Sequence, residues 1–203
     1  MFMTKEEYKQ ELFRINTDYD KTVFIQKYYF DGSPYIFWER DGEYYHFKKR
    51  IADNFEIEYT NINIVGSARF GFSPYKFTDF TFDSDIDVAI YNESLFDKFF
   101  DLISDYAYLI KSRVILLRKN QYNQYIKFIK YFSTGWMRPD LLPVNTTEFK
   151  RLREEWDDFF KSISYGNSEV GNYKVKAGLF KSQYYAEKYY KYSVEQLIKR
   201  LKG

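Results

Sequence analysis

Two short runs of β-branched residues limit what this chain can fold into. They are INIV at residues 62–65 and IDVAI at residues 86–90, while apolar residues recur at helical spacing through most of the rest of the chain. Few strands among many amphipathic helices are typical of a small sheet that helices cover. The sequence therefore predicts an α+β fold, a mixed α/β arrangement with a small mixed β-sheet flanked by helices and a helical C-terminal half.

The expected helices lie on both sides of these strands. Residues 4–15 should form one helix, with Thr4 and Glu7 as its capping box. Apolar residues at helical spacing favour a second helix over residues 43–55, with Asp41 as its cap, although a hairpin at the Asp-Gly turn is an alternative. Residues 16–34 are expected to form a loop or a short strand. A third strand is expected at residues 114–117, and further helices at about residues 93–106, 122–132, 147–162 and 182–201.

These elements suggest three parts that pack as one compact unit. Residues 1–58 should form an N-terminal helical segment, residues 59–118 a small mixed α/β core, and residues 119–203 a helical C-terminal region. Residues 174–180 (KVKAGLF) are read as the segment that leads into the last helix. The chain length of 203 residues is sufficient to bury one sizeable core.

The composition excludes several kinds of chemistry. The chain has no cysteine and its only histidine is His46, so thiol catalysis, Cys-ligated zinc and His-rich metal sites are excluded. Any catalysis should depend on carboxylates, and any metal should be one that prefers oxygen ligands, Mg²⁺ or Mn²⁺. The 31 Lys and Arg and 29 Asp and Glu are read as mixed throughout, which disfavours an extended nucleic-acid footprint. No membrane partner and a cytoplasmic location are expected, because no apolar run spans a bilayer and the first residues soon become charged.

Residues 64–90 contain the pattern most informative about function. The first strand ends at Gly66-Ser67, where a glycine lets the backbone approach a phosphate closely. The second strand contains Asp85 and Asp87, just after Ser84. Side chains alternate between the two faces of a strand, so residues two positions apart place both carboxylates on one face. Two neighbouring carboxylates repel each other unless a cation lies between them. Mg²⁺ combines such ligands with substrate phosphates, so the pattern indicates a nucleoside-triphosphate site.

This pattern resembles the signature of the DNA polymerase beta-like nucleotidyltransferase superfamily. The similar residues are Gly66-Ser67 and Ser84-Asp85-Ile86-Asp87-Val88, and the resemblance covers roughly residues 43–118. It implies that Gly66 and Ser67 contact the triphosphate, together with Ser84, and that Asp85 and Asp87 hold metal ions. It also implies a third acid on a neighbouring strand.

The third acid is the point at which the resemblance weakens. The expected strand at residues 114–117 has no carboxylate, so Asp140 is the first candidate, with Asp83 and Asp79 behind it. Asp140 has an alternative role in an Asx-type turn. Arg138 would contact phosphates or pair with Asp140. The 18 positions from Ser67 to Asp85 predict an extra loop over the pocket or the acceptor path. Candidates for phosphate contacts or for solvated helix faces are Lys127, Lys130, Lys174, Lys176 and Lys181.

The resemblance implies an enzyme that uses an NTP and Mg²⁺ or Mn²⁺. It would transfer a nucleoside monophosphate to a hydroxyl of an RNA end, a protein or a small molecule, and several small members of the superfamily act as toxins or in phage defence. Three alternatives stay open at this point. One is a catalytically silent module of the same fold that binds nucleotide or a partner. Another is a synthase of a nucleotide signal, which is usually a longer chain. The last is an aromatic-rich adaptor without a nucleotide site.

Overall fold

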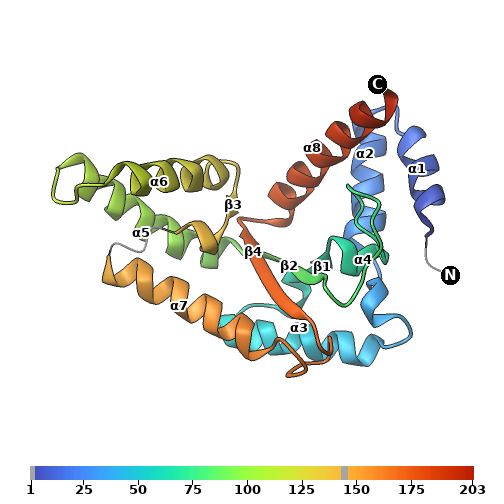
Figure 1. The fold of residues 1–203 in the computed structure, drawn as a ribbon, viewed down its shortest axis with the longest axis horizontal. Helices are drawn as coiled ribbons and strands as arrows, with labels where there is room; N and C mark the ends of the chain where they lie inside the picture. The colour runs from blue at the N-terminus through green and yellow to red at the C-terminus, as the bar shows by residue number, and fades with distance from the viewer. Residues whose placement is uncertain (1–2, 143–145) are drawn as a thin grey trace.

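The computed structural model describes residues 3–142 and 146–203, and its architecture is α+β, as the sequence predicts (Figure 1). Four strands form one mixed sheet in the order β1-β2-β4-β3. Strand β2 is antiparallel to β1 and parallel to β4, and β3 is antiparallel to β4. The strands are β1 (Ile62–Val65), β2 (Asp85–Tyr91), β3 (Trp136–Met137) and β4 (Lys174–Phe180).

Eight α-helices surround this sheet within the described residues. They confirm the helices that the sequence predicts at both ends of the chain and between the strands. None of the helices in the described ranges is long and apolar enough to cross a membrane. The helices are α1 (Lys5–Phe13), α2 (Asp18–Ile25), α3 (Asp41–Phe55), α4 (Ser67–Phe70), α5 (Glu93–Lys111), α6 (Lys119–Phe132), α7 (Thr147–Ser162) and α8 (Gln183–Lys202).

The two faces of the sheet are covered differently. On one face Ile86, Val88 and Ile90 of β2 are buried in the main core, against apolar residues of α3, α5, α6 and α7. On the other face Ala89 and Tyr91 pack against α8 in a smaller cluster. The alternation that buries the isoleucines on the first face therefore turns Asp85 and Asp87 toward the second face. Helix α8 packs on that face against Ala89 and Tyr91, in the C-terminal half of β2.

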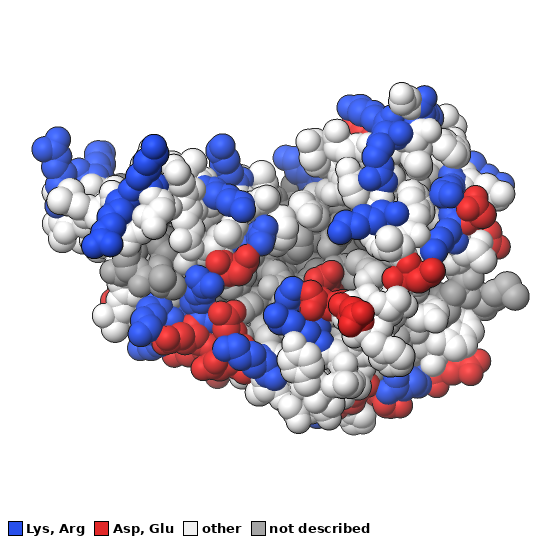
Figure 2. Space-filling model, viewed as in Figure 1, with Lys and Arg blue, Asp and Glu red and all other residues white. Residues whose placement is uncertain are grey.

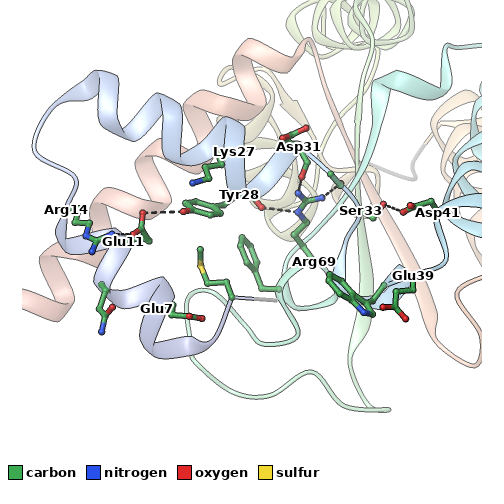
Figure 3. Close-up of a pocket in the computed structure, with 15 residues that line it drawn as sticks. Glu7, Glu11, Arg14, Lys27, Tyr28, Asp31, Ser33, Glu39, Asp41 and Arg69 are labelled. Atoms are coloured by element: carbon green, nitrogen blue, oxygen red, sulfur yellow. Dashed lines mark hydrogen bonds and ion pairs between the residues drawn. The ribbon is translucent and has the colours of Figure 1, made fainter. Parts of the chain in front are cut away.

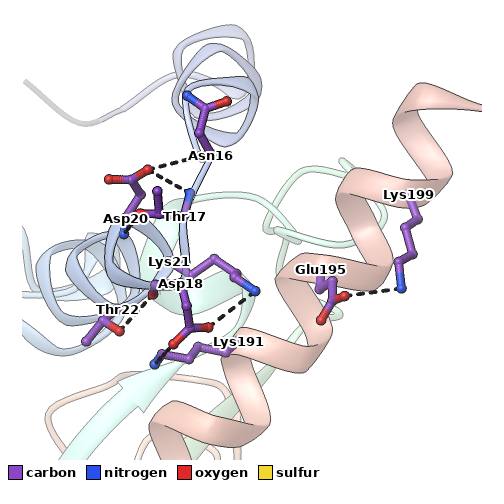
Figure 4. Close-up of polar contacts among 9 residues, drawn as sticks. All are labelled: Asn16, Thr17, Asp18, Asp20, Lys21, Thr22, Lys191, Glu195 and Lys199. Atoms are coloured by element: carbon purple, nitrogen blue, oxygen red, sulfur yellow. Dashed lines mark hydrogen bonds and ion pairs between the residues drawn. The ribbon is translucent and has the colours of Figure 1, made fainter.

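The N-terminal helices hold α8 in this position. Helix α8 lies beside α2 and α1 (Figure 1), and Lys191 of α8 forms an ion pair with Asp18 of α2 at 3.3 Å (Figure 4). Asp18 also pairs with Lys21 one turn along α2. These exposed pairs contribute little free energy by themselves. The buried aromatic cluster beneath them, built from α1, α2, α8 and the loop after α4, holds the helices together.

Some sequence expectations are wrong. Residues 16–34 are mainly helical, because Thr17 and Asp20 form a capping box at the start of α2 and a π-helix follows over Gln26–Phe30. Asp41 lies inside the first turn of α3 and does not cap it with its side chain. Residues 114–117 are no strand, because Val114 and Leu116 are 70% and 78% exposed in the connection between α5 and α6.

The second neighbour of β2 in the sheet, opposite β1, is β4. It lies in the segment that the sequence predicts only to lead into the last helix. Its alternation of Lys174, Val175 and Lys176 matches a strand with one buried face. Both β3 and β4 lie outside residues 59–118. The sheet that positions the carboxylates is therefore built from more of the chain than the expected core.

Candidate functional site

The two carboxylates lie at the start of β2, between its neighbours in the sheet. Asp87 is paired in register with Val65, the last residue of β1, and with Lys176 of β4. Asp85 is paired with Lys174. The structure therefore brings Asp85 and Asp87 onto one face, as predicted, and adds two lysines from the neighbouring parallel strand.

Gly66 fits directly against the Asp87 carboxylate. Its backbone has φ 67° and ψ −148°, a conformation that only glycine adopts readily. A Cβ atom at this position would lie 2.8 Å from Oδ2 of Asp87. The turn after β1 thus requires glycine for its backbone conformation and for the space that the carboxylate occupies.

Lys176 partly balances the charge of the carboxylate pair. Its Nζ donates a hydrogen bond to Oδ2 of Asp85 and forms an ion pair with it. This bond, with Asp87 and Asp140 nearby, raises the pKa of Lys176. Asp87 keeps solvent-accessible surface inside a concave pocket, yet the protein atoms that crowd it raise its pKa to about 6. The neighbouring Asp85 raises that pKa further, and Lys176 opposes the shift.

A pocket of about 650 Å³ opens beside Asp87. Gly66 and Asp87 line one side of it, and Arg138 and Asp140 line another. The indole of Trp136 forms part of its wall, stacked on Phe180 with ring centroids 5.7 Å apart. A Cβ at position 178 would lie 2.6 Å from Nε1 of Trp136, so Gly178 makes room for this indole on β4. Lys174, Lys176 and Tyr189 also line the pocket.

The donor set fits a magnesium ion that also binds substrate. Mg²⁺ commonly takes one or two protein carboxylates and completes its shell with water and phosphate oxygens. Asp85 and Asp87 supply two such groups on one face of β2. The surrounding protein atoms and the neighbouring Asp85 raise the pKa of Asp87, and a bound divalent cation would favour its ionised form. Among the described residues, no cluster of three Asp, Glu or His side chains offers a complete protein cage.

None of the three candidates for the third acid lies on a strand next to β2. Asp140 lines the pocket, but Arg138 binds it through two hydrogen bonds of 3.1 and 2.6 Å. This is the clasp that the sequence left as one alternative for Arg138. Asp79 forms an ion pair with Lys5 at 2.6 Å, and Asp83 is exposed in the loop before β2. Strand β4 contributes Lys176 opposite Asp87 instead of an acid.

Ser67, Ser84 and the long loop do not line the pocket. The Ser84 hydroxyl accepts a hydrogen bond from the backbone of Thr81 and stabilises the turn before β2. Ser67 begins α4, next to Gly66. The loop that the 18-residue spacing predicts exists, but it packs on α1 and α8, where Arg200 donates to the carbonyl of Tyr75. None of its residues lines this pocket, so the first alternative is wrong. That the loop covers the acceptor path stays a prediction.

The sequence pattern does not identify Arg69, whose side chain anchors the turn after β1 to the N-terminal helical segment. Its side chain is buried, and its guanidinium donates to the backbone carbonyls of Tyr28, Asp31 and Gly32 at the end of the π-helix (Figure 3). A hollow of about 980 Å³ beside Arg69 is lined mainly by residues of the N-terminal segment. Arg69 therefore ties α4, three residues after Gly66, to the N-terminal helices. A basic residue shortly after the glycine turn was the only signal in the sequence.

No family model, curated protein or solved structure matches this chain.

Removing the Asp87 charge should stabilise the protein in a pH-dependent way. The folded state raises the pKa of this carboxyl from 3.8 to about 6, so the folded protein binds the proton more tightly than the unfolded chain. Ionisation consequently destabilises the fold as the pH rises from about 4 to about 6. In the absence of divalent cations, Asp87→Asn should melt at a higher temperature than the wild type, and this difference in melting temperature should grow as the pH rises from about 4 to about 6. A difference that stays constant across this range would contradict the raised pKa of Asp87. Asp101→Asn, which removes an exposed carboxylate on α5, is the control.

Proposed function

We propose that this protein is a Mg²⁺-dependent nucleotidyltransferase. It transfers a nucleoside monophosphate from an NTP to an acceptor hydroxyl and releases pyrophosphate. The observation that supports this proposal most strongly is the carboxylate pair of β2 beside the Gly66 turn, at a pocket that also contains cationic side chains.

The residues of this site have separate roles in this reaction. Asp87, Asp140, Lys174 and Lys176 line the pocket, and Asp85 lies next to it on β2. Asp85 and Asp87 would hold Mg²⁺, which neutralises charge on the phosphates and on the entering and leaving oxygens. Lys174 and Lys176 would bind phosphate oxygens, and the backbone at Gly66 leaves room for the triphosphate. The bond from the acceptor oxygen to the α-phosphorus forms while the bond to the bridging oxygen breaks, and pyrophosphate leaves. Asp140 and Asp157 are the other carboxylates that line the pocket, and we assign the proton of the acceptor hydroxyl to Asp140.

Trp136 and Tyr189 offer a surface for the nucleobase. Their rings lie 4.6 Å apart between centroids and line the same pocket as Asp87. An aromatic face stacks on any of the bases, so this wall supports NTP binding without selecting one base.

A second function, nucleotide binding without turnover, is favoured by Lys176. This lysine lies opposite Asp87 and pairs with Asp85, where an acid would complete the metal-binding set. Such a module would be stabilised by NTP and Mg²⁺ in a thermal-shift titration but would release no pyrophosphate.

Incubation with each NTP, labelled at the α-phosphate, in the presence of Mg²⁺ and total cell extract tests the proposal. We expect label to enter one class of acceptor and pyrophosphate to be released in equal amount. Stabilisation by NTP without pyrophosphate release would favour the silent module, and no stabilisation by any NTP would contradict both functions.

A further inference from the structure

Positive charge is concentrated in one segment of the chain. Between Asp105 and Asp140 the sequence contains seven Lys and Arg residues and no acidic residue. Removing these seven from the 31 basic residues of the chain leaves 24 against 29 acidic ones. The sequence-based expectation that both charges are mixed throughout is therefore wrong for this segment. The seven residues are Lys111, Arg113, Arg118, Lys119, Lys127, Lys130 and Arg138.

This segment forms a helical hairpin, residues 106–132, that we call the basic arm. It consists of the end of α5, the connection 112–118 and α6, and it projects from the sheet (Figure 1). Tyr106 of α5 packs edge-on against Tyr125 of α6, with ring centroids 5.6 Å apart. Figure 2 shows Lys and Arg along the upper edge of this arm with no Asp or Glu among them. The arm thus has a defined shape and a single sign of charge.

The cations of the arm have no acidic partners. All six of its Lys and Arg residues are exposed, and none forms an ion pair within the part of the chain that the structure describes. Helix α7 is a contrast, because Lys150 pairs with Glu154 and Arg151 with Glu155 along its surface. The positive potential of the arm is therefore not cancelled locally.

Three of these lysines form a stripe along α6. Lys119, Lys127 and Lys130 are separated by eight and three positions, which places them on one side of the helix, opposite the buried Phe128 and Phe132. Helix α6 has 14 residues and extends over about 21 Å. Its C-terminal end leads to Arg138, whose guanidinium lies 5.3 Å from the Tyr131 ring centroid and lines the pocket of Asp87.

We propose that the basic arm binds single-stranded RNA and directs its end to the pocket. The lysine stripe matches a chain of phosphates, and Tyr122 and Tyr108, which are 51% and 65% exposed, present faces on which bases can stack. The terminal ribose hydroxyls would then be the acceptor. That last step rests on the proposed function, whereas RNA binding by the arm does not.

RNA fits this surface better than an anionic membrane does. The most exposed aliphatic residues of the arm, Val114 and Leu116, lie at its tip, where a bilayer would contact it. A membrane contact at the tip would leave Lys127 and Lys130 without a partner. The stripe instead continues along α6 toward the pocket, as a polymer of phosphates requires. RNA is favoured over DNA because single strands with accessible bases are the usual form in which RNA is recognised.

The test is the salt dependence of binding to a labelled RNA of about 15 nucleotides, measured without NTP by fluorescence anisotropy. Lys119→Gln/Lys127→Gln/Lys130→Gln should weaken binding about 10-fold or more and reduce the slope of log affinity against log salt by about 2. The control Lys49→Gln/Lys150→Gln/Arg151→Gln removes the same charge from exposed residues that are paired with acids. We expect its affinity and slope to stay close to those of the wild type.

Three outcomes would overturn the proposal. The first is an equal loss of RNA affinity in the control variant. The second is tighter binding of single-stranded DNA of the same sequence. The third is binding to anionic vesicles that displaces RNA and is lost in Val114→Ser/Leu116→Ser. Asp85→Asn should keep the RNA affinity of the wild type. A failure of RNA binding is thereby distinguished from a failure of the proposed function, which concerns NTP turnover.

Discussion

Replacement of Asp87 with asparagine should reduce NTP turnover about 1000-fold, because a metal ion supplies several kcal/mol of transition-state stabilisation. The amide removes one negative ligand but keeps the shape of the side chain beside Gly66. At neutral pH the same variant should unfold at a higher temperature than the wild type, because the charge that the crowding protein atoms and Asp85 disfavour is gone. Loss of activity together with a gain of stability cannot be attributed to unfolding. Pyrophosphate release and thermal unfolding measured on one preparation check both effects.

Asp101→Asn is the matched control for this result. It makes the same chemical change at an exposed position of α5, outside the pocket, and should retain the turnover of the wild type. Turnover by Asp87→Asn within a few-fold of the wild-type value would contradict the assignment of the carboxylate pair.

Replacement of Gly66 with alanine should have the second largest effect. The residue would keep an unfavourable backbone conformation, which costs about 1–3 kcal/mol, and its Cβ would press on the Asp87 carboxylate from 2.8 Å. We expect the melting temperature to fall by about 5 °C and NTP turnover to be largely lost. Thermal unfolding and pyrophosphate release again measure the two effects.

Two further variants separate the backbone cost from the contact. Position 32 also has a positive φ, of 68°, but no atom lies within 4 Å of an added Cβ, so Gly32→Ala measures the cost of a positive φ in open space. In an Asp87→Ala background the carboxylate is gone, and Gly66→Ala should then cost less than it does alone. Equal costs in both backgrounds would show that the two residues are not in contact.

The local part of this site could be predicted from the sequence. The β-branched runs of β1 and β2, the glycine between them and the alternation of Asp85 and Asp87 are all short-range patterns. Each specifies a strand, a turn or a face with few neighbours involved. The same holds for the capping box of Thr4 and Glu7, which the structure confirms.

The partners of the carboxylates could not be predicted in this way. Asp87 is opposite Lys176 because β2 pairs with β4 across more than eighty intervening residues, and periodicity does not identify the partner of a strand. The apolar run at 114–117 has the pattern of a strand, yet Val114 and Leu116 lie exposed at the tip of the basic arm, and Ile115 and Leu117 pack against the core. The clasp between Arg138 and Asp140 likewise depends on the short helical turn Pro139–Leu141, which the sequence pattern did not specify.

The central claim is that Asp85 and Asp87 bind a nucleoside triphosphate through Mg²⁺. The most direct test is calorimetric titration of the wild type and of Asp85→Asn/Asp87→Asn with a non-hydrolysable NTP analogue, with and without Mg²⁺. We expect the wild type to bind the analogue markedly more tightly with Mg²⁺ than without it. In the double variant, Mg²⁺ should not change the affinity for the analogue. Equal affinity with and without Mg²⁺ in the wild type, or an unchanged Mg²⁺ effect in the double variant, would contradict this claim.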